Sequence, residues 1–195
     1  MQTLSSLTEL DSVNIMLSTI GESPINSLAQ DQSTVDVALA RQVLREITIS
    51  VQQTGWHFNT EVNWVMQPAL PLGEILIPAN CVQIDTSGPD LTRDVAMRGP
   101  RLYDRVAHSY SFAKSITVDM IILLDFLELP QAARNYITIR AARVFQQRMV
   151  GSDTLGAFTA KDEAMARASL KKLDANTGDY NILSDSWSVA RSLTR

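Results

Sequence analysis

Residues 55–66, GWHFNTEVNWVM, decide the fold because the spacing of apolar side chains changes within this stretch. Upstream, residues 40–51 repeat apolar side chains every three or four positions, which is the period of a helix, and Gly55 supplies a stop signal. From Trp56 onward the period becomes two, which is the period of a strand. The positions expected to form one buried face of this strand are Trp56, Phe58, Thr60, Val62, Trp64 and Met66.

Four segments around this stretch carry helix start and stop signals. The clearest is a capping box at Thr8 and Asp11, which is followed by an apolar stripe and by Gly21. Pro130 is a favourable first-turn residue for a third helix, since its missing N–H has no partner at that position anyway. The predicted helices run from Thr8 to Gly21, from Ser33 to Gly55, from Pro130 to Gly151 and from Thr159, with Asp162 three residues on, to Gly178.

Strand-like alternation fills the interval between the second and third helices. It recurs in residues 74–85, 95–97, 102–106 and 116–126, with a turn signal at Gly99-Pro100. We therefore expect an α+β protein. Its N- and C-terminal helix pairs, residues 1–55 and 130–178, should form a four-helix bundle, interrupted by an antiparallel β insertion domain, residues 56–129. Residues 179–195 are expected to form an extended C-terminal tail.

The bulk composition is that of an ordinary globular chain. Its 195 residues are 45% hydrophobic and 19% charged. The single cysteine, Cys81, excludes an internal disulfide and any CxxC motif, which favours assembly inside a cell. The N-terminus lacks the basic and apolar regions of a secretory signal. The longest apolar run, residues 120–124, is far shorter than the roughly 20 residues of a membrane span, so we expect no membrane association.

No sequence pattern of a catalytic, metal or cofactor site is present. His57 and His108 are the only histidines, and neither belongs to a zinc- or calcium-binding motif. The chain also lacks GxGxxG, Walker and GxSxG motifs, so we expect neither an enzyme nor a cofactor. Two alternatives stay open, because sites can assemble from distant segments. One is a hydrolase of cell-wall or capsular polysaccharide, and the other is a DNA-binding module in the basic C-terminal part.

The charge is unevenly distributed along the chain. Residues 1–133 carry 7 basic and 15 acidic side chains, whereas residues 134–195 carry 10 basic and 6 acidic ones. Copies with opposite charge at their two ends can associate head to tail and close a ring. In such a ring Arg140, Arg143 and Arg148 of the predicted third helix would pair with acidic residues of the next copy.

Several segments together resemble the tail tubular protein A family, the head-to-tail adaptors of short-tailed bacteriophages. They are GWHFN at 55–59, RLYDR at 101–105, LPQAARNYITIRAARVFQQRMVGS at 129–152, DYNIL at 179–183, and the opening Ile20-Gly21-Glu22 before Pro24. Their order and spacing cover almost the whole chain.

The resemblance implies a structural subunit of a twelve-fold ring in the virion tail, assembled in the host cytoplasm. Its implied partners are the portal above, the nozzle protein (tail tubular protein B) below, the tail fibre and further copies of itself. Genomic DNA would pass through the ring without sequence-specific binding. In that family the helical part and the C-terminal tail engage the portal and adjacent subunits, while the β part faces the nozzle and fibre.

Contact and packing roles follow for individual residues. Trp56 and Phe58 are expected at the junction of bundle and sheet, and Leu102 and Tyr103 are expected to pack the sheet. A local ion pair is expected between Asp104 and Arg105. The candidate contacts of the tail with the portal or a neighbouring copy are Tyr180, Ile182, Leu183 and Trp187.

Overall fold

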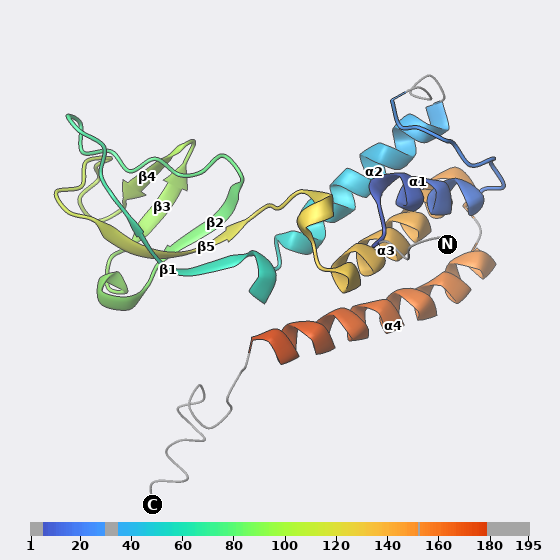
Figure 1. Ribbon diagram of the computed structural model, residues 1–195. Coiled ribbons are helices and arrows are strands. Elements are labelled where there is room, and N and C mark those ends of the chain that lie inside the picture. Colours follow the sequence, from blue (N-terminus) through green and yellow to red (C-terminus); the bar gives the residue numbers. More distant parts are fainter. Residues whose placement is uncertain (1–5, 30–34, 152, 179–195) are drawn as a thin grey trace, which may run out of the picture. The chain divides into compact units, whose positions relative to one another are not determined.

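The computed structural model describes residues 6–29, 35–151 and 153–178, and it confirms an α+β protein (Figure 1). The helices are α1 (Glu9–Ser18), α2 (Val35–Gln52), α3 (Gln131–Met149) and α4 (Asp153–Thr177), with short 3-10 helices η1 (His57–Asn59), η2 (Gly88–Asp90) and η3 (Phe126–Glu128). The strands are β1 (Thr60–Met66), β2 (Cys81–Thr86), β3 (Val95–Arg98), β4 (Arg101–Asp104) and β5 (Ile116–Ile122).

The chain divides into two compact units. The helical unit comprises the described residues up to Leu44 and from Pro130 onward, and the β unit comprises Arg45–Leu129. The division therefore falls inside α2, whereas the predicted domain limit lies at residues 55 and 56. The predicted domain limits, the four-helix bundle and the extended tail stay predictions.

In the helical unit α3 packs against both α1 and α4 (Figure 1). Thr138 of α3 shares a hydrogen bond of 2.9 Å with the hydroxyl of Ser12 in α1, while Arg143 of α3 forms an ion pair with Glu163 of α4. At 3.6 residues per turn, Thr138 and Arg143 stand about 140° apart around the axis of α3. The two neighbouring helices therefore contact different sides of α3, which explains why it is buried on most faces.

The predicted helix starts are confirmed at α1 and wrong at α4. The hydroxyl of Thr8 accepts a 3.1 Å hydrogen bond from the N–H of Asp11, and the carboxylate of Asp11 accepts one of 3.0 Å from the N–H of Thr8. The helix α4 begins at Asp153, six residues before Thr159. A threonine with an acidic residue three positions later also occurs inside helices, because these residue types cost only a few tenths of a kcal/mol there.

The β unit is built from a three-stranded antiparallel sheet and a hairpin. The sheet has the order β1-β5-β2, and the hairpin pairs β3 with β4. Arg98 lies opposite Arg101, so the predicted turn at Gly99-Pro100 is confirmed. The core of the unit consists of Met66, Ile75, Ile77, Cys81, Ile84, Val95, Leu102, Phe112, Ile116, Val118 and Met120.

The strand predicted from Trp56 begins later than expected and does not have one dry face. It starts at Thr60, because residues 57–59 form η1 instead. Val62 and Trp64, which were expected to be buried, are 63% and 53% exposed. The reason is a register shift between Glu61 and Trp64, where Asn63 adopts a positive φ of 55° and its N–H donates to Asp119. Such a bulge interrupts the alternation of faces.

A buried polar cluster joins the end of α2 to β5 inside the β unit. The amide of Gln52 donates to the carbonyl of Leu124 at 3.0 Å and accepts from its N–H at 2.8 Å. The amide of Asn59 donates to the carbonyls of Gln52 and Ile122 at 3.0 and 2.9 Å. Gly55 lies between them at φ +73°, a conformation that favours glycine, and a Cβ there would lie 2.7 Å from Cδ1 of Ile121, whose side chain would have to shift.

Candidate interaction surface

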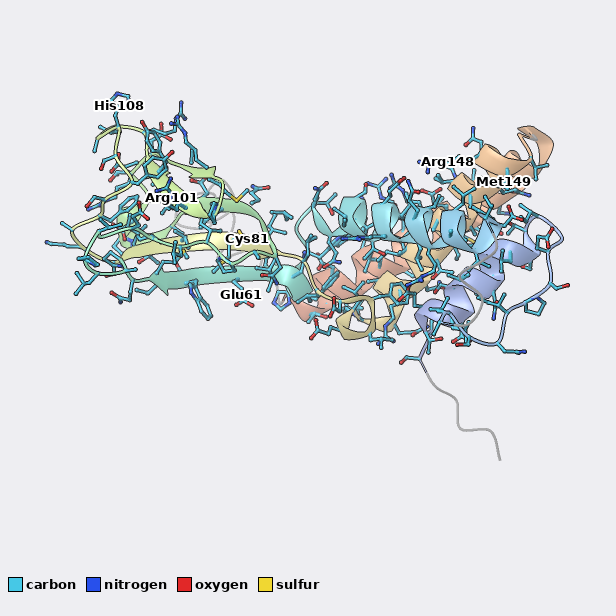
Figure 2. The ribbon with its side chains drawn as sticks, turned by 90° about the horizontal axis from the view of Figure 1, so that it is seen from above. Glu61, Cys81, Arg101, His108, Arg148 and Met149 are labelled. Atoms are coloured by element: carbon cyan, nitrogen blue, oxygen red, sulfur yellow. The ribbon has the colours of Figure 1, made fainter. Side chains whose placement is uncertain are left out.

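The described part of the chain brings together no recognisable catalytic or metal-binding constellation. No group of three potential metal ligands occurs within it. His57 lies in η1, and His108 lies exposed in a turn at φ 52° (Figure 2). The thiol of Cys81 points into the core and donates to the carbonyl of Gln83 at 3.2 Å, and burial raises its pKa. Among the described helices, none is long and apolar enough to cross a bilayer.

Two of the three predicted contact arginines meet a carboxylate of α4. Arg143 Nε lies 2.6 Å from Glu163 Oε2, and Arg140 Nε lies 3.9 Å from Glu163 Oε1. Arg140 also donates through Nη1 to the hydroxyl of Tyr136 at 2.9 Å. The side chain of Glu163 is only 14% exposed, so its negative charge is neutralised at the contact between α3 and α4.

Arg148 does not join this cluster. It lies in the last turn of α3, where a cation interacts favourably with the helix dipole, and its side chain is exposed (Figure 2). The three arginines predicted as one contact set thus have two different environments. Arg140 and Arg143 hold α4 on α3, and only Arg148 is fully at the surface.

A cation-lined groove follows α4 beside Arg143. Its volume is about 370 Å³, and its lining residues are Arg143, Ala160, Glu163, Ala164, Arg167, Ala168 and Lys171. We call this surface the α4 groove. The three alanines are spaced by four residues and keep its floor low, while charged side chains form its walls.

Arg167 and Lys171 give the α4 groove its excess of positive charge. They are exposed and spaced by four residues, so they lie on the same face of α4 about one turn apart. In residues 6–29, 35–151 and 153–178, neither side chain has a hydrogen-bond or ion-pair partner. Sequence reasoning missed both residues, although their four-residue spacing on a predicted helix was a usable signal.

The predicted junction residues Trp56 and Phe58 are half-buried and belong to the β unit. Their rings stack nearly parallel, with centroids 6.5 Å apart and an interplanar angle of 5°. The indole N–H of Trp56 donates to the carbonyl of Val51 at 2.7 Å. These contacts hold the chain leaving α2 in place, and a role at a junction between domains stays a prediction.

Leu102 and Tyr103 lie on β4, where the sequence placed them. Leu102 is fully buried in the core of the β unit. Tyr103 is 9% exposed, packs edge-on against Tyr110 and carries the guanidinium of Arg98 3.6 Å from its ring centre.

The expected ion pair between Asp104 and Arg105 is wrong. Arg105 pairs instead with Asp94 at 3.1 Å, across the hairpin. The carboxylate of Asp104 accepts from the backbone N–H groups of Val106 and Ala107 and closes the turn. A carboxylate at the start of a turn readily accepts hydrogen bonds from the backbone N–H groups two and three residues later, so it does not need the neighbouring cation as a partner.

The β unit also exposes a set of large apolar side chains that the sequence did not single out. They belong to β1 and to the segment that follows it, and are between 53% and 90% exposed. The set is Val62, Trp64, Val65, Leu70, Leu72 and Leu76. Contiguous exposed apolar patches mark protein contact surfaces, and this set supplies the candidates for one on the β unit.

The predicted tail contacts Tyr180, Ile182, Leu183 and Trp187 lie outside the described residues.

A family model and a curated relative both match the chain. The family model described as "Tail tubular protein" matches residues 10–180, which span both units. The relative is tail tubular protein A of Klebsiella phage KP34. It is 26% identical over 156 residues, which cover 80% of this chain and 81% of that protein.

Proposed function

The chain belongs to the tail tubular protein family, and from this premise we propose that it is the ring-forming adaptor between the portal and the tail nozzle of a short-tailed phage. Membership makes it a structural protein of a phage tail and therefore a virion component. It also confirms the resemblance seen in the quoted segments. The proposed partners are the portal protein, the nozzle protein (tail tubular protein B), the tail fibre and further copies of the chain.

The observation that carries the proposal is the extent of the family match. It runs from the first turn of α1 to beyond the end of α4, so it includes the helical unit, the β unit and every described strand. A family likeness confined to one unit would support only a shared module. A likeness across both supports the same overall task, which for an adaptor is to present separate surfaces to separate neighbours.

The two units expose chemically different surfaces, as this task requires. The helical unit carries the charged α4 groove, whereas the β unit carries the exposed apolar set on β1 and the following segment. We assign the helical unit and the C-terminal tail to the portal and to neighbouring copies, and the β unit to the nozzle and fibre. Passing DNA would meet a chain of net charge −4, which disfavours tight binding to phosphates.

The test is to mix the purified full-length chain with its portal protein and to weigh the complex by mass photometry. We expect a ring of twelve chains of 21.6 kDa, which adds about 260 kDa to the portal. Adding the nozzle protein should then give a larger complex only when the chain is present. A portal mass that stays unchanged at micromolar chain would overturn the proposal.

The polysaccharide hydrolase is the alternative with the weaker support, because the family is one of structural proteins. Its test is turnover of peptidoglycan and capsular oligosaccharides by the purified chain, with Asp119→Asn and Asp125→Asn as carboxylate controls. The adaptor proposal also includes assembly of the ring in the host cytoplasm.

A further inference from the structure

The α4 groove has a net positive charge, because its lining holds three cations and one acid. Glu163 is the acid in its wall, and Arg143 and Arg140 already neutralise it. Arg167 and Lys171 remain as two exposed cations about one helical turn apart. The groove therefore fits a surface that supplies carboxylates.

The first two helices of the same unit carry the complementary charge. The described residues up to Leu44 hold four acidic side chains and one basic one, while residues 131–177 hold eight basic and four acidic ones. Glu9 pairs with Arg41 at 3.5 Å, and Asp11 completes the capping box of α1 with Thr8. Glu22 is left exposed and Asp36 half-buried.

Glu22 and Asp36 are held on neighbouring elements. Glu22 follows α1 in a segment fixed by two hydrogen bonds of 2.9 and 3.0 Å between the side chain of Asn14 and the backbone of Ile25. Asp36 lies in the first turn of α2, the helix that Arg41 ties to α1. In the described part of the chain, the side chains of Glu22 and Asp36 form no ion pair or hydrogen bond. We call the surface around these two carboxylates the acidic end.

The α4 groove and the acidic end lie on different sides of the helical unit. Thr138 contacts α1 and Arg140 contacts α4, and these two residues stand about 200° apart around α3. One copy therefore cannot cover its own groove with its own acidic end. A second copy can cover the groove of the first with its acidic end. This heterologous contact leaves one groove and one acidic end of the pair free. A contact of this kind repeats until the ring closes.

We propose that the α4 groove of one copy binds the acidic end of the next copy, with Arg167 and Lys171 facing Glu22 and Asp36. This inference rests on the proposed ring-forming function and names the contact between its subunits. The low floor formed by Ala160, Ala164 and Ala168 lets a neighbouring backbone approach closely. A helix or loop of a second copy can use that floor, whereas two neighbouring cations are too few to follow a DNA backbone.

The experiment compares three charge-reversal variants of the full-length chain. Arg167→Glu with Lys171→Glu reverses the groove, Glu22→Lys with Asp36→Lys reverses the acidic end, and the third variant combines all four changes. The matched control is Lys161→Glu with Lys172→Glu, which makes the same charge change on exposed positions of α4 outside the groove. The altered residues are exposed apart from Asp36, which is half-buried, and circular dichroism with thermal unfolding checks that each variant folds.

Self-association is measured by sedimentation velocity up to about 0.1 mM, and ring formation on the portal by mass photometry. We expect each two-residue reversal to weaken association at least about tenfold, because like charges then face each other. The fourfold variant should recover it, and the control should match the original chain. Association should also weaken as salt rises.

Cross-linking tests proximity directly. Copies with Lys171→Cys are mixed with copies carrying Asp36→Cys under mild oxidation. The native Cys81 is buried in the core and stays in place, and the original chain reports its background. A disulfide-linked dimer should form only in the mixture.

The outcomes separate this contact from the adaptor function. If rings form equally well on the portal with both reversal variants and no cross-link appears, the proposed contact is overturned. The adaptor function is then unaffected. No portal complex overturns the adaptor. In that case salt-sensitive self-association lost in the groove variant still supports the contact, and a monomer at every concentration overturns it. Binding of duplex DNA that depends on Arg167 and Lys171, without self-association, also overturns it.

Discussion

Arg143 Nε and Glu163 Oε2 lie 2.6 Å apart, and both atoms have almost no exposed surface. Within the described residues, neither atom has another partner or makes a well-aligned hydrogen bond, so each is compensated by the opposite charge alone. This pair, with Arg140 beside it, joins α3 to α4. It also leaves the wall of the α4 groove neutral at Glu163 and positive further along α4.

Glu163→Ala should lower the free energy of unfolding by about 1–3 kcal/mol, because two partly buried arginines lose their counter-charge. Chemical denaturation followed by circular dichroism measures the change. The control is Asp162→Ala, which removes an exposed carboxylate at the next position of the same helix. Equal stability of the two variants would show that the pair contributes nothing.

Asn59→Ala should destabilise the β unit by about 2–4 kcal/mol. The substitution removes the side-chain partner of the Trp56 N–H and of the Ile122 carbonyl in a buried site, while the carbonyl of Gln52 keeps only the N–H of Gly55. Thermal or urea unfolding monitored by tryptophan fluorescence detects the loss. Asn135→Ala on the exposed side of α3 is the matched control and should change stability by less than about 0.5 kcal/mol. A loss at Asn59 no larger than this would contradict the structure.

Asp11 should titrate below its ordinary pKa. The hydroxyl of Thr8, at 2.6 Å, and the N–H of Thr8 both donate to its carboxylate, and these hydrogen bonds favour the charged form and lower the pKa from 3.8. A lowered pKa in the folded state contributes stability that is present above pH 3.8. That stability is lost as the pH falls through the folded-state pKa.

Thr8→Ala should move the pKa of Asp11 part of the way back toward 3.8 and reduce this pH dependence, because the hydroxyl is lost while the N–H of residue 8 stays. A carboxyl-carbon NMR titration of both proteins measures the two values. Identical titration curves in the two proteins would mean that the capping box does not act on Asp11.

Deletion of residues 179–195 should leave a folded protein that no longer attaches to the portal. The physical reason is that the tail combines polar residues with isolated anchors, Tyr180, Ile182, Leu183 and Trp187, which suit a contact with another protein. Circular dichroism verifies the fold, and mass photometry with portal measures attachment. The full-length chain with Ile182→Ser and Trp187→Ser tests the anchors without a deletion and should also lose attachment. Attachment at normal strength by the truncated chain would refute the role of the tail.

Several elements could be predicted because their signals are local. The capping box of α1 and the Gly99-Pro100 hairpin depend on residues three or four apart, so the interactions that form them are visible in the sequence. The strand β5 alternates cleanly because it lies between two other strands with one face on the core. The start of α4 could not be predicted, because a capping-box pattern inside a helix looks the same in the sequence as one at the first residue of a helix.

The sequence by itself determined the α+β class, the four helices, the period change near Gly55 and the family likeness. All of these depend on side-chain order and spacing, which need no knowledge of distant partners. Only the tertiary structure decided that β1 is an edge strand whose Trp64 is 53% exposed, and that Glu163 lies between Arg140 and Arg143. Burial and charge pairing join residues that are far apart along the chain, so no local pattern records them. For the same reason Arg167 and Lys171 became a candidate site only when the groove between helices was known.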